Sequence, residues 1–444
     1  MNAATAQLID SFRHSAPYVN AHRGKTFVIM LGGEAIQDGE YRAIINDVAL
    51  LHSLGIKLVL VHGARPQIDA ELAARGLEAV FHHGVRITDE PSLKVIRQVS
   101  GSLQFDIMAR LSMGLSNTPM QGANINVVSG NFVIAQPLGV DEGVDYCLSG
   151  RVRRIDVEGL QQQLAKDCIV LVGPVAVSVT GESFNLTAEE VATQIAIRLK
   201  ADKIIGFSHQ HGLLDEDGSV ISEILPGEAL SYLTQHGEQI CPASKAFVEA
   251  CVEACRRGVP RCHLISHLQD GALLQELFTR DGIGTQIVTE SAERLRRASI
   301  ADIGGVLNLI RPLEEQGILV RRSREQLEME IEQFMVVERD SLIIGCAALY
   351  PFEEDNAGEF ACLVVHPDYR DADRGSLLLR HIIGQAKGRG YDRLFALTTR
   401  SIHWFLEHGF NIVDVDALPT KKKQLYNYQR KSKILMLELK DVIN

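Results

Sequence analysis

The sequence lacks any long apolar run, although 46% of its 444 residues are hydrophobic. A helix that crosses a membrane needs about 20 consecutive apolar residues, and no stretch of the chain approaches that length. The segment from Met1 to Asp10 also lacks the positive residues followed by an apolar run that mark a secretion signal. We therefore expect a cytoplasmic protein that makes no contact with membranes.

Cysteine is scattered, and none of the eight cysteines forms a Cys-x-x-Cys pair. Cys251 and Cys255 are one helical turn apart and Cys262 precedes His263, but this is a poor set of metal ligands. We interpret the cysteines as reduced core residues and expect no metal.

Positive charge is in deficit, because 45 Lys and Arg face 56 Asp and Glu, giving a formal net charge of −11. This balance argues against a nucleic-acid partner. The exception is a basic stretch near the C-terminus, formed by residues 421–423 and 430–433. It is either a solvated face or a pocket for an acidic small molecule.

The length and apolar content predict two or three cores rather than one. In the first ~290 residues apolar strands alternate with helical patterns, which is typical of a parallel α/β sheet. An amphipathic helix over residues 10–20 precedes the first strand. The predicted strands cover residues 26–31, 57–62, 126–128, 168–179, 203–207 and 261–265, and the predicted helices cover 41–54 and 188–199.

Glycine turns follow the first two strands, at Gly32-Gly33 and at Gly63-Ala64. Phosphate or carboxylate ligands bind at such strand ends, although either turn could be a tight turn and nothing more. This half resembles the amino-acid kinase family, and within it the N-acetylglutamate kinases. The resemblance covers residues ~20 to ~290 and depends on Leu31-Gly-Gly33, Val61-His-Gly63, Gly84-Val-Arg-Ile-Thr88, Asn185-Leu-Thr-Ala-Glu189 and Asp281-Gly-Ile-Gly-Thr285.

The resemblance fails where a kinase transfers phosphate. Met30 occupies the place of the family lysine, and Ala64-Arg65 replaces a further glycine. A methionine cannot neutralise the charge of a phosphoryl group in transfer. Lys245 is the one family lysine with a plausible match, so we expect this domain to be catalytically silent.

Residues 288–296 are short, polar and charged, which indicates a linker. We assign residues 1–287 to the first domain and 297–444 to the second. In the second domain we predict a strand over 297–300, helices over 302–316 and 324–332, a hairpin of 334–338 with 342–350, a strand over 360–365, a helix from Leu377, a strand over 393–397 and a helix over 401–408.

The segment from Glu359 to Leu379 reads as a strand, a loop and the start of a helix. Free backbone N–H groups at such a helix start can bind an anion, and Arg370 and Arg374 would add positive charge. A pyrophosphate is then the expected ligand. The alternative is that the segment is an ordinary turn with solvated arginines and binds no ligand.

This segment resembles the acetyl-CoA-binding core of the GNAT acetyltransferases, whose signature is Gln/Arg-x-x-Gly-x-Gly/Ala. Arg370 and Gly375 match its outer positions, and Asp373 stands where a glycine is usual. Residues 404–410 resemble the aromatic-x-x-x-Gly-Phe ending of the last GNAT helix. Many members have a proton-donating tyrosine there, where this chain has Phe405.

The order of the two halves resembles the bacterial N-acetylglutamate synthase family over essentially the full chain. The implied fold is an N-terminal three-layer αβα amino-acid-kinase-like domain with a mainly parallel sheet, followed by a C-terminal GNAT α+β domain. The implied reaction moves the acetyl group of acetyl-CoA to the α-amine of L-glutamate, which is the first step of arginine biosynthesis. A phosphotransferase and a non-catalytic arginine sensor are the alternatives.

A carboxylate at the end of the central strand can take the proton that the attacking ammonium must lose, which favours Glu359 as the general base. Alternatively, Glu359 is only a charged residue at the edge of the strand. The family resemblance further assigns Thr398 as the donor to the coenzyme A thiolate, although threonine is also a common strand former. The coenzyme would contact Cys362, Leu363, Val364, Arg370, Asp373, Arg374, Gly375 and Ser376.

The two carboxylates of glutamate call for planar guanidinium groups. The resemblance points to Leu319, Arg321, Arg430 and Ser432 as the substrate site, with Arg322 or Lys433 as alternatives.

The resemblance also gives the first domain a purpose, namely feedback inhibition by L-arginine. The members of this group are homo-oligomers, and we expect a hexamer. The residues that match the arginine site of the group are Tyr18, Lys203, His263, Glu276 and Gly282.

Overall fold

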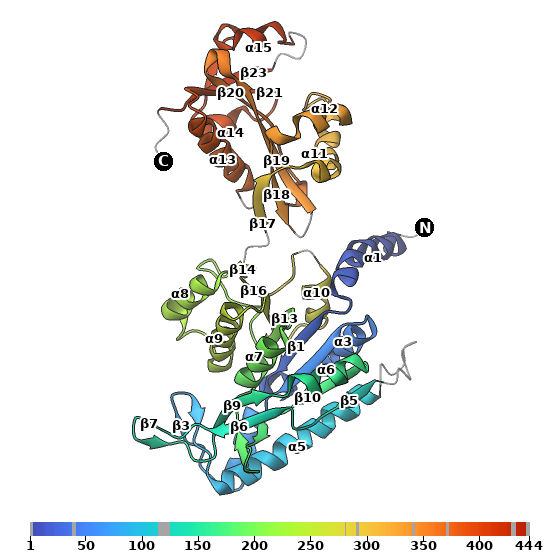
Figure 1. Cartoon of the computed structure of the whole chain (residues 1–444), viewed down its shortest axis with the longest axis vertical. Helices are drawn as coiled ribbons and strands as arrows, with labels where there is room; N and C mark the ends of the chain where they lie inside the picture. Colours follow the sequence, from blue (N-terminus) through green and yellow to red (C-terminus); the bar gives the residue numbers. More distant parts are fainter. Residues whose placement is uncertain are drawn as a thin grey trace. The chain divides into compact units, whose positions relative to one another are not determined.

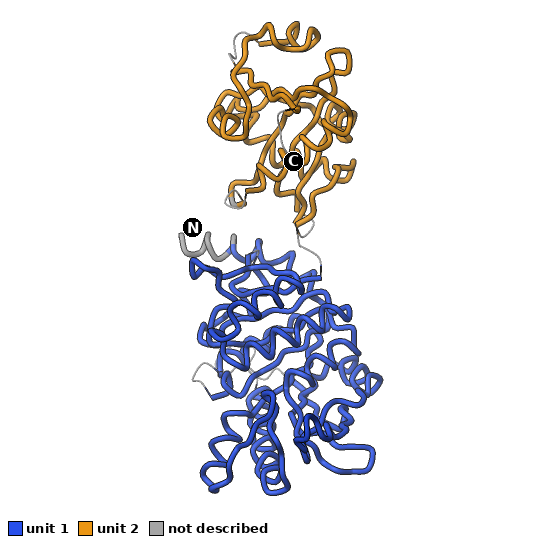
Figure 2. Tube along the Cα trace, turned by 90° about the vertical axis from the view of Figure 1, so that its left-hand side faces the viewer, with its two compact units in different colours: residues 1–291 blue, residues 292–444 orange. Residues whose placement is uncertain are grey.

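The computed structural model describes residues 3–37, 41–113, 125–279, 281–289, 293–339, 342–369, 373–427 and 432–440. The chain divides into two compact units, residues 1–291 (unit 1) and 292–444 (unit 2), coloured separately in Figure 2. Two predicted site residues, Arg370 and Arg430, lie outside the described residues.

Unit 1 is built on an eight-stranded sheet with the order β14-β16-β15-β13-β1-β2-β10-β5 (Figure 1). Neighbouring strands are parallel except β15 and β16. The strands are β1 (Thr26–Leu31), β2 (Lys57–His62), β5 (Asn126–Val128), β10 (Cys168–Val172), β13 (Lys203–Ser208), β14 (Glu223–Ile224), β15 (Arg261–Ser266) and β16 (Thr285–Val288).

Alternate residues of each central strand enter two different apolar cores. Val28 and Met30 of β1 enter one core with helices α6 to α9, whereas Phe27 and Ile29 enter the other with α1, α3 and α10. This alternation makes unit 1 a three-layer α/β/α structure. Its helices are α1 (Ala3–His22), α2 (Gly33–Gln37), α3 (Tyr41–Ser53), α4 (Arg65–Ala74), α5 (Glu90–Ser112), α6 (Val157–Ala165), α7 (Ala188–Leu199), α8 (Pro226–His236), α9 (Pro242–Arg256) and α10 (Ala272–Phe278).

A second, four-stranded sheet with the order β12-β11-β6-β9 and two small hairpins complete unit 1. The sequence analysis did not predict these strands, except residues 175–177, which lie within the strand predicted over 168–179. They are β3 (Phe81–His82), β4 (Val85–Arg86), β6 (Val133–Pro137), β7 (Val140–Asp141), β8 (Val144–Asp145), β9 (Gly150–Ile155), β11 (Val175–Val177) and β12 (Ser183–Asn185).

Unit 2 is a seven-stranded sheet with the order β17-β18-β19-β20-β21-β23-β22. Its neighbouring strands are antiparallel except β20 and β21. The strands are β17 (Glu293–Arg297), β18 (Phe334–Arg339), β19 (Leu342–Phe352), β20 (Ala357–Val365), β21 (Arg393–Thr398), β22 (Asn411–Val413) and β23 (Lys433–Glu438).

Helices cover both faces of the sheet in unit 2. The helices over residues 303–315 and 324–330 pack on one apolar core, and those over 374–388 and 402–407 pack on the other. The helices are α11 (Ile303–Glu315), α12 (Arg324–Glu330), α13 (Arg374–Gly388), α14 (Ile402–Glu407) and α15 (Thr420–Gln424), with 3-10 turns at Ile300–Asp302, Ile331–Gln333, Glu353–Asp355, Pro367–Tyr369 and Val415–Ala417.

Three predicted element boundaries were wrong. Helix α1 starts at Ala3 rather than near residue 10. The predicted strand over 168–179 is interrupted at Gly173-Pro174, where proline removes a ladder donor. The strand predicted at 297–300 lies at Glu293–Arg297, inside the predicted linker, because its charged residues pair with β18 rather than remaining in solvent.

Among the described helices, none is long and apolar enough to cross a membrane.

Candidate active site and buried ionic cluster

Strands β20 and β21 separate in the middle of the sheet of unit 2. Their parallel pairing covers only Ala357 to Glu359, which face Arg393 to Phe395. Beyond Glu359, β20 continues to Val365 while β21 continues to Thr398 beside β23. The facing edges of the two strands therefore no longer bond each other, which leaves backbone groups of β20 free to bind a ligand.

A bulge in β20 lies next to this opening. Cys346 pairs with Val364 and Ala348 with Ala361, so one residue of β19 faces two residues of β20. The first of these is Cys362, whose φ of 51° is unusual for a residue with a side chain. Such bulges re-aim backbone groups next to active sites.

The Cys362 thiol itself is buried in an apolar core. Burial raises the pKa of Cys362 to about 11, so the thiol stays protonated near neutral pH. This agrees with its interpretation as a core residue rather than a nucleophile.

Glu359 lies where the strands separate, and it is 8% exposed. Its two carboxylate oxygens contact the Lys422 ammonium of α15 at 2.6 and 2.7 Å. The sequence analysis saw Lys422 only as part of a basic stretch and did not connect it to Glu359. A cation therefore already occupies the position that a substrate ammonium needs.

The N-terminus of α13 lies where the sequence analysis expects an anion to bind. The backbone N–H groups of residues 374–376 lie in its first turn and have no carbonyl partner within the helix. Asp373 precedes them with a φ of 48°, so this aspartate adopts the left-handed conformation of the usual glycine. Aspartate tolerates that conformation better than most residues.

Arg374, which the sequence analysis expects to add positive charge at this helix start, already pairs with groups of unit 2. Its guanidinium is 11% exposed and lies 2.9 Å from a carboxylate oxygen of Glu293 in β17, and it donates to the carbonyl of Tyr369 at 2.7 Å. It joins α13 to the first strand of the unit. Only its backbone N–H remains available to an anion.

The Ser376 hydroxyl is also committed. His408 Nδ1 lies 2.7 Å from the carbonyl of Trp404 and must donate to it, so Nε2 accepts the Ser376 proton at 2.7 Å. Gly375, between these two committed residues, lies near the Trp404 ring. The first turn of α13 therefore offers backbone donors rather than side chains.

Thr398 ends β21, and its hydroxyl oxygen accepts the backbone N–H groups of Arg400 and Ser401. These bonds direct the hydroxyl proton away from the turn, which suits a proton donor. Phe405 is buried and meets Phe360 and Phe410 edge to face. It packs the core where many relatives of the fold have a tyrosine.

The substrate residues predicted from the resemblance differ in their exposure. Leu319 is half-buried against an apolar core and Arg321 is exposed. Arg322 is half-buried, with its guanidinium 6.0 Å from the Tyr350 ring centre. Ser432 is buried and its carbonyl accepts the Tyr426 hydroxyl, while Lys433 is exposed and begins β23.

Unit 1 contains a buried ionic chain. Lys203 Nζ donates to His263 Nε2 at 3.0 Å, and His263 Nδ1 therefore donates to Glu276 Oε1 at 2.6 Å. The Glu276 side chain is 0% exposed, and its second oxygen accepts the amides of Ile283 and Gly284. The Lys203 ammonium and the Glu276 carboxylate are thus connected through the neutral imidazole of His263.

The protonation states follow from this geometry. Burial and the Lys203 ammonium lower the pKa of His263 to about 4. Burial would raise the pKa of Glu276, but the hydrogen bonds from His263 and from two amides outweigh it and lower the pKa. Glu276 is therefore ionised near neutral pH, while His263 is neutral.

Two further predicted residues lie around this chain. Gly282 has a φ of 62°, and a Cβ there would meet Glu276 Oε2 at 2.5 Å, so only glycine fits. Tyr18 packs on the core that lies on the α1 side of the sheet. His22 of α1 was missed by the sequence analysis, and its Nε2 lies 2.8 Å from the carbonyl of Leu277.

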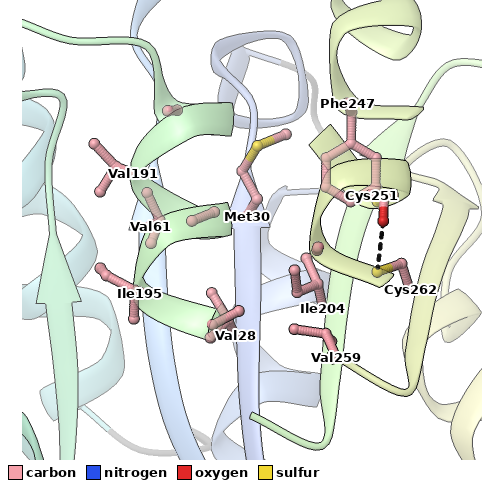
Figure 3. Close-up of a cluster of buried hydrophobic side chains, with 14 of the residues drawn as sticks. Val28, Met30, Val61, Val191, Ile195, Ile204, Phe247, Cys251, Val259 and Cys262 are labelled. Carbon is pink, nitrogen blue, oxygen red and sulfur yellow. Dashed lines mark hydrogen bonds between the residues drawn. The ribbon is translucent and has the colours of Figure 1, made fainter. Parts of the chain in front are cut away.

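The glycine turns Gly32-Gly33 and Gly63-Ala64 of unit 1 line an open cavity, but the position of the family lysine is apolar. Figure 3 shows Met30 among apolar side chains that include Val61 and Phe247, and it is 3% exposed. A Cβ on Gly33 would meet the Pro66 ring at 2.5 Å. A cavity of about 710 Å³ remains beside these turns, lined in part by Arg65, Glu189 and Lys245.

Comparison with known proteins identifies the family. Residues 25–266 match the Amino acid kinase family and residues 330–412 match the Acetyltransferase (GNAT) domain. The amino-acid acetyltransferase of Shewanella oneidensis is 77% identical over 437 residues, covering 98% of each chain. That of Escherichia coli K12 is 63% identical over 435 residues, again covering 98% of each. The chain belongs to the amino-acid acetyltransferases.

A solved structure supports this fold across both units of the acetyltransferase. N-acetylglutamate synthase from Neisseria gonorrhoeae, complexed with coenzyme A and L-arginine, is 37% identical with a TM-score of 0.88, covering 97% of this chain and 99% of that chain. The same enzyme complexed with coenzyme A and N-acetyl-glutamate is 38% identical with a TM-score of 0.62 and the same coverage.

The low pKa of His263 gives the acetyltransferase a pH-dependent stability. The unfolded chain binds a proton at this imidazole below pH 6.5, whereas the folded chain does so only below about 4. The free energy of unfolding should therefore fall as the pH is lowered from 6.5 to about 4, by up to about 1.4 kcal/mol per pH unit from this group.

Urea unfolding at several pH values between 4.5 and 7 measures this effect. His263→Gln should reduce the slope of unfolding free energy against pH by about one proton near pH 5. His211→Gln, at an exposed histidine of unit 1, is the control and should keep the wild-type slope. An unchanged slope in His263→Gln would show that His263 is already protonated in the folded chain.

Proposed function

We propose that this acetyltransferase transfers the acetyl group of acetyl-CoA to the α-amine of L-glutamate, giving N-acetyl-L-glutamate and coenzyme A, in the cytoplasm. The observation that carries the proposal is the buried Glu359 at the point where β20 and β21 separate. The neighbour complexed with coenzyme A and N-acetyl-glutamate supports the choice of substrate.

The coenzyme binds along the opened edge of β20. Backbone groups of residues 362–364 contact the pantetheine arm and the acetyl oxygen, because the edge of β20 that faces β21 is unpaired beyond Glu359. The backbone N–H groups of residues 374–376 bind the diphosphate at the positive end of α13. Arg370 and Asp373 flank this cradle in the sequence.

Glu359 acts as the general base, directly or through a water molecule. The α-ammonium of the substrate displaces the Lys422 ammonium from the carboxylate and loses a proton to it. The amine then attacks the thioester carbon, so a C–N bond forms while the C–S bond breaks. The nitrogen then carries one proton more than the amide product, and water relays that proton to Thr398 as Thr398 gives its own proton to the departing thiolate.

The substrate binds to Leu319, Arg321, Arg430 and Ser432, with its carboxylates on Arg321, Arg430 and Ser432. Arg321 is exposed and therefore free to move onto an incoming anion. Arg322 is the alternative because it is half-buried near Tyr350 in the β19 strand. Arg321→Ala and Arg322→Ala separate the two, since the residue that binds glutamate should raise KM for glutamate and leave KM for acetyl-CoA unchanged.

A thiol-release assay tests the proposal. Acetyl-CoA and the full chain are mixed with L-glutamate, L-aspartate, L-glutamine or L-lysine, and free coenzyme A is measured together with the mass of the product. L-glutamate should give the highest kcat/KM by a wide margin, because L-glutamine and L-lysine lack a side-chain carboxylate and that of L-aspartate is one methylene too short. Equal rates with all four amino acids would reject glutamate as the substrate.

Unit 1 carries no kinase activity in this proposal. Met30 is buried in an apolar core, and its side chain cannot neutralise the charge of a phosphoryl group in transfer. We expect no ADP release from ATP in the presence of N-acetylglutamate, measured by a coupled assay against a chain-free control. ADP release that depends on N-acetylglutamate would contradict this expectation.

Unit 1 instead binds L-arginine and inhibits the acetyl transfer. The support is the convergence of Lys203, His263, Glu276 and Gly282 at one buried place, together with the neighbour complexed with L-arginine. Glu276 takes the guanidinium, Lys203 pairs with the carboxylate, and Tyr18 stacks on the ligand. Because Glu276 has no exposed surface, binding requires the loop at residues 281–284 to open, which makes arginine favour one state of unit 1.

The chain acts as a homo-oligomer, and we propose a hexamer. Helix α1 leaves Phe12 74% exposed and Ile9 37% exposed, an apolar pair suited to a contact with another copy. Light scattering on the full chain and on Phe12→Ser measures the assembly. Loss of the larger species in the variant supports the role of α1, and a monomeric wild-type chain rejects the oligomer.

A further inference from the structure

Two hairpin tips of unit 1 bring three metal-ligating side chains together. His82 and His83 belong to the β3–β4 hairpin, and Glu142 belongs to the β7–β8 hairpin, which lies near it in Figure 1. The imidazole nitrogens and a carboxylate oxygen all lie within 4.8 Å of one another. Among the described residues, this is the one group of three or more histidine, cysteine or acidic side chains with that spacing.

We propose that these residues bind a divalent transition-metal ion of the zinc class. His83 Nε2 lies 3.1 Å and His82 Nε2 lies 4.0 Å from Glu142 Oε2. A tetrahedral ion with bonds of about 2.0–2.1 Å holds its ligand atoms roughly 3.3 Å apart, so small side-chain rotations suffice. Two imidazoles and a carboxylate, with water at an open position, are a common ligand set for Zn²⁺.

The turn geometry is an independent observation for a site. His83-Gly84 and Glu142-Gly143 are both two-residue hairpin loops, and all four residues have φ between 47° and 81°. Asparagine, aspartate or glycine is the usual first residue of such a loop. Histidine and glutamate occupy that strained place in both hairpins, and both side chains are ligands of the proposed ion.

The backbone explains how adjacent histidines can share one ion. Successive side chains of an ordinary strand point to opposite faces. The positive φ of His83 turns its ring back beside that of His82, and the ring centres lie 4.0 Å apart.

The unpaired ring nitrogen of His82 also supports a metal site. Its Nε2 is buried and has no hydrogen-bond partner among the described residues. An unpaired buried nitrogen is costly, and a metal bond satisfies it. Each ring then carries its remaining proton on Nδ1.

The ion would tie the two hairpins together at the rim of the large cavity of unit 1. His83, Gly84, Val85 and Arg86 of the first hairpin all line that cavity. The second hairpin lines no part of it, so the ion would link the rim to a separate element. The site is independent of the proposed acetyl transfer, whose residues lie in unit 2.

The experiment uses the full chain after treatment with EDTA and buffer exchange. Calorimetric titration with Zn²⁺ should give one ion per chain, and Co²⁺ should develop visible absorption bands of a site with fewer than six ligands. His83→Asn and Glu142→Asn remove a ligand but supply a residue that these turns prefer. Both should weaken Zn²⁺ binding at least about 100-fold, since even substitutions outside the ligand set cost about 10- to 100-fold.

Thermal unfolding separates loss of the site from loss of the fold. Without metal, His83→Asn should unfold at or above the wild-type temperature, because asparagine tolerates positive φ. Zn²⁺ should raise the unfolding temperature of the wild type and of the control His211→Ala, but not that of His83→Asn. Equal Zn²⁺ affinity in His83→Asn and the wild type, or no Zn²⁺ binding by the wild type, would reject the site.

Discussion

Replacing Glu359 by glutamine is expected to lower kcat for acetyl transfer to L-glutamate by about 10²- to 10⁴-fold, the usual contribution of a general base. The amide keeps the shape of the carboxylate but cannot accept a proton near neutral pH. Acetyl-CoA binding should be retained, because the coenzyme contacts the backbone of residues 362–364 and the start of α13. The rate deficit should shrink as the pH rises, because more of the substrate amine is then already deprotonated.

The neighbouring ion pair provides a matched control. Lys421 and Glu354 form an exposed pair at 2.8 Å, one residue along α15 from the buried pair of Lys422 with Glu359. Glu354→Gln should leave kcat near the wild-type value. A second variant, Lys422→Met, keeps the carboxylate and removes its cation, so it should retain far more activity than Glu359→Gln. Turnover of Glu359→Gln near the wild-type rate at pH 7 would exclude Glu359 as the base.

Replacing Glu276 by glutamine is expected to weaken L-arginine binding by roughly 10- to 150-fold, which corresponds to the 1.5–3 kcal/mol of a hydrogen bond to a charged group. Inhibition of acetyl transfer should be lost to the same extent, because binding and inhibition are linked through the same state of unit 1. Calorimetry on the full chain measures binding, and the thiol-release assay with added L-arginine measures inhibition.

Two further variants show whether the carboxylate itself is responsible. Gly282→Ala keeps the charge but places a methyl group 2.5 Å from the present position of Glu276 Oε2, so it should also weaken arginine binding. A chain without residues 1–20 removes Tyr18 and should do the same. Glu71→Gln, on the surface of α4, should respond to arginine like the wild type. Normal binding and inhibition in the first three variants together would place the arginine site elsewhere.

The periodicity of the sequence predicted the main strands of both units because each is long enough for its pattern to be read locally. Val28 and Met30 alternate with Phe27 and Ile29, and the structure divides these residues between two cores. The two-residue strands of the hairpins escaped prediction, as did β6, β9 and β12 of the second sheet. Two residues carry too little periodicity to be read locally, so pairing between segments determines the hairpin strands.

The sequence alone determined which chemical groups are available. It placed a carboxylate at residue 359, a ring without an ionisable hydroxyl at Phe405, and a methionine in place of a kinase lysine. No fold can change these identities. The departure from glycine at Asp373 was visible as well. The sequence did not show whether the loop keeps its geometry with Asp373, because φ at that residue depends on the turn that surrounds it.

The tertiary structure decided which charged side chains form ion pairs within the chain and which do not. Arg374 meets Glu293, 81 residues away in the sequence, and Glu359 meets Lys422, 63 residues away. The chain of Lys203, His263 and Glu276 likewise joins two parallel strands and a helix. Ion pairs form between whichever side chains the packing of strands and helices brings within about 4 Å. That proximity is a property of topology, which the local spacing of residues along the chain does not contain.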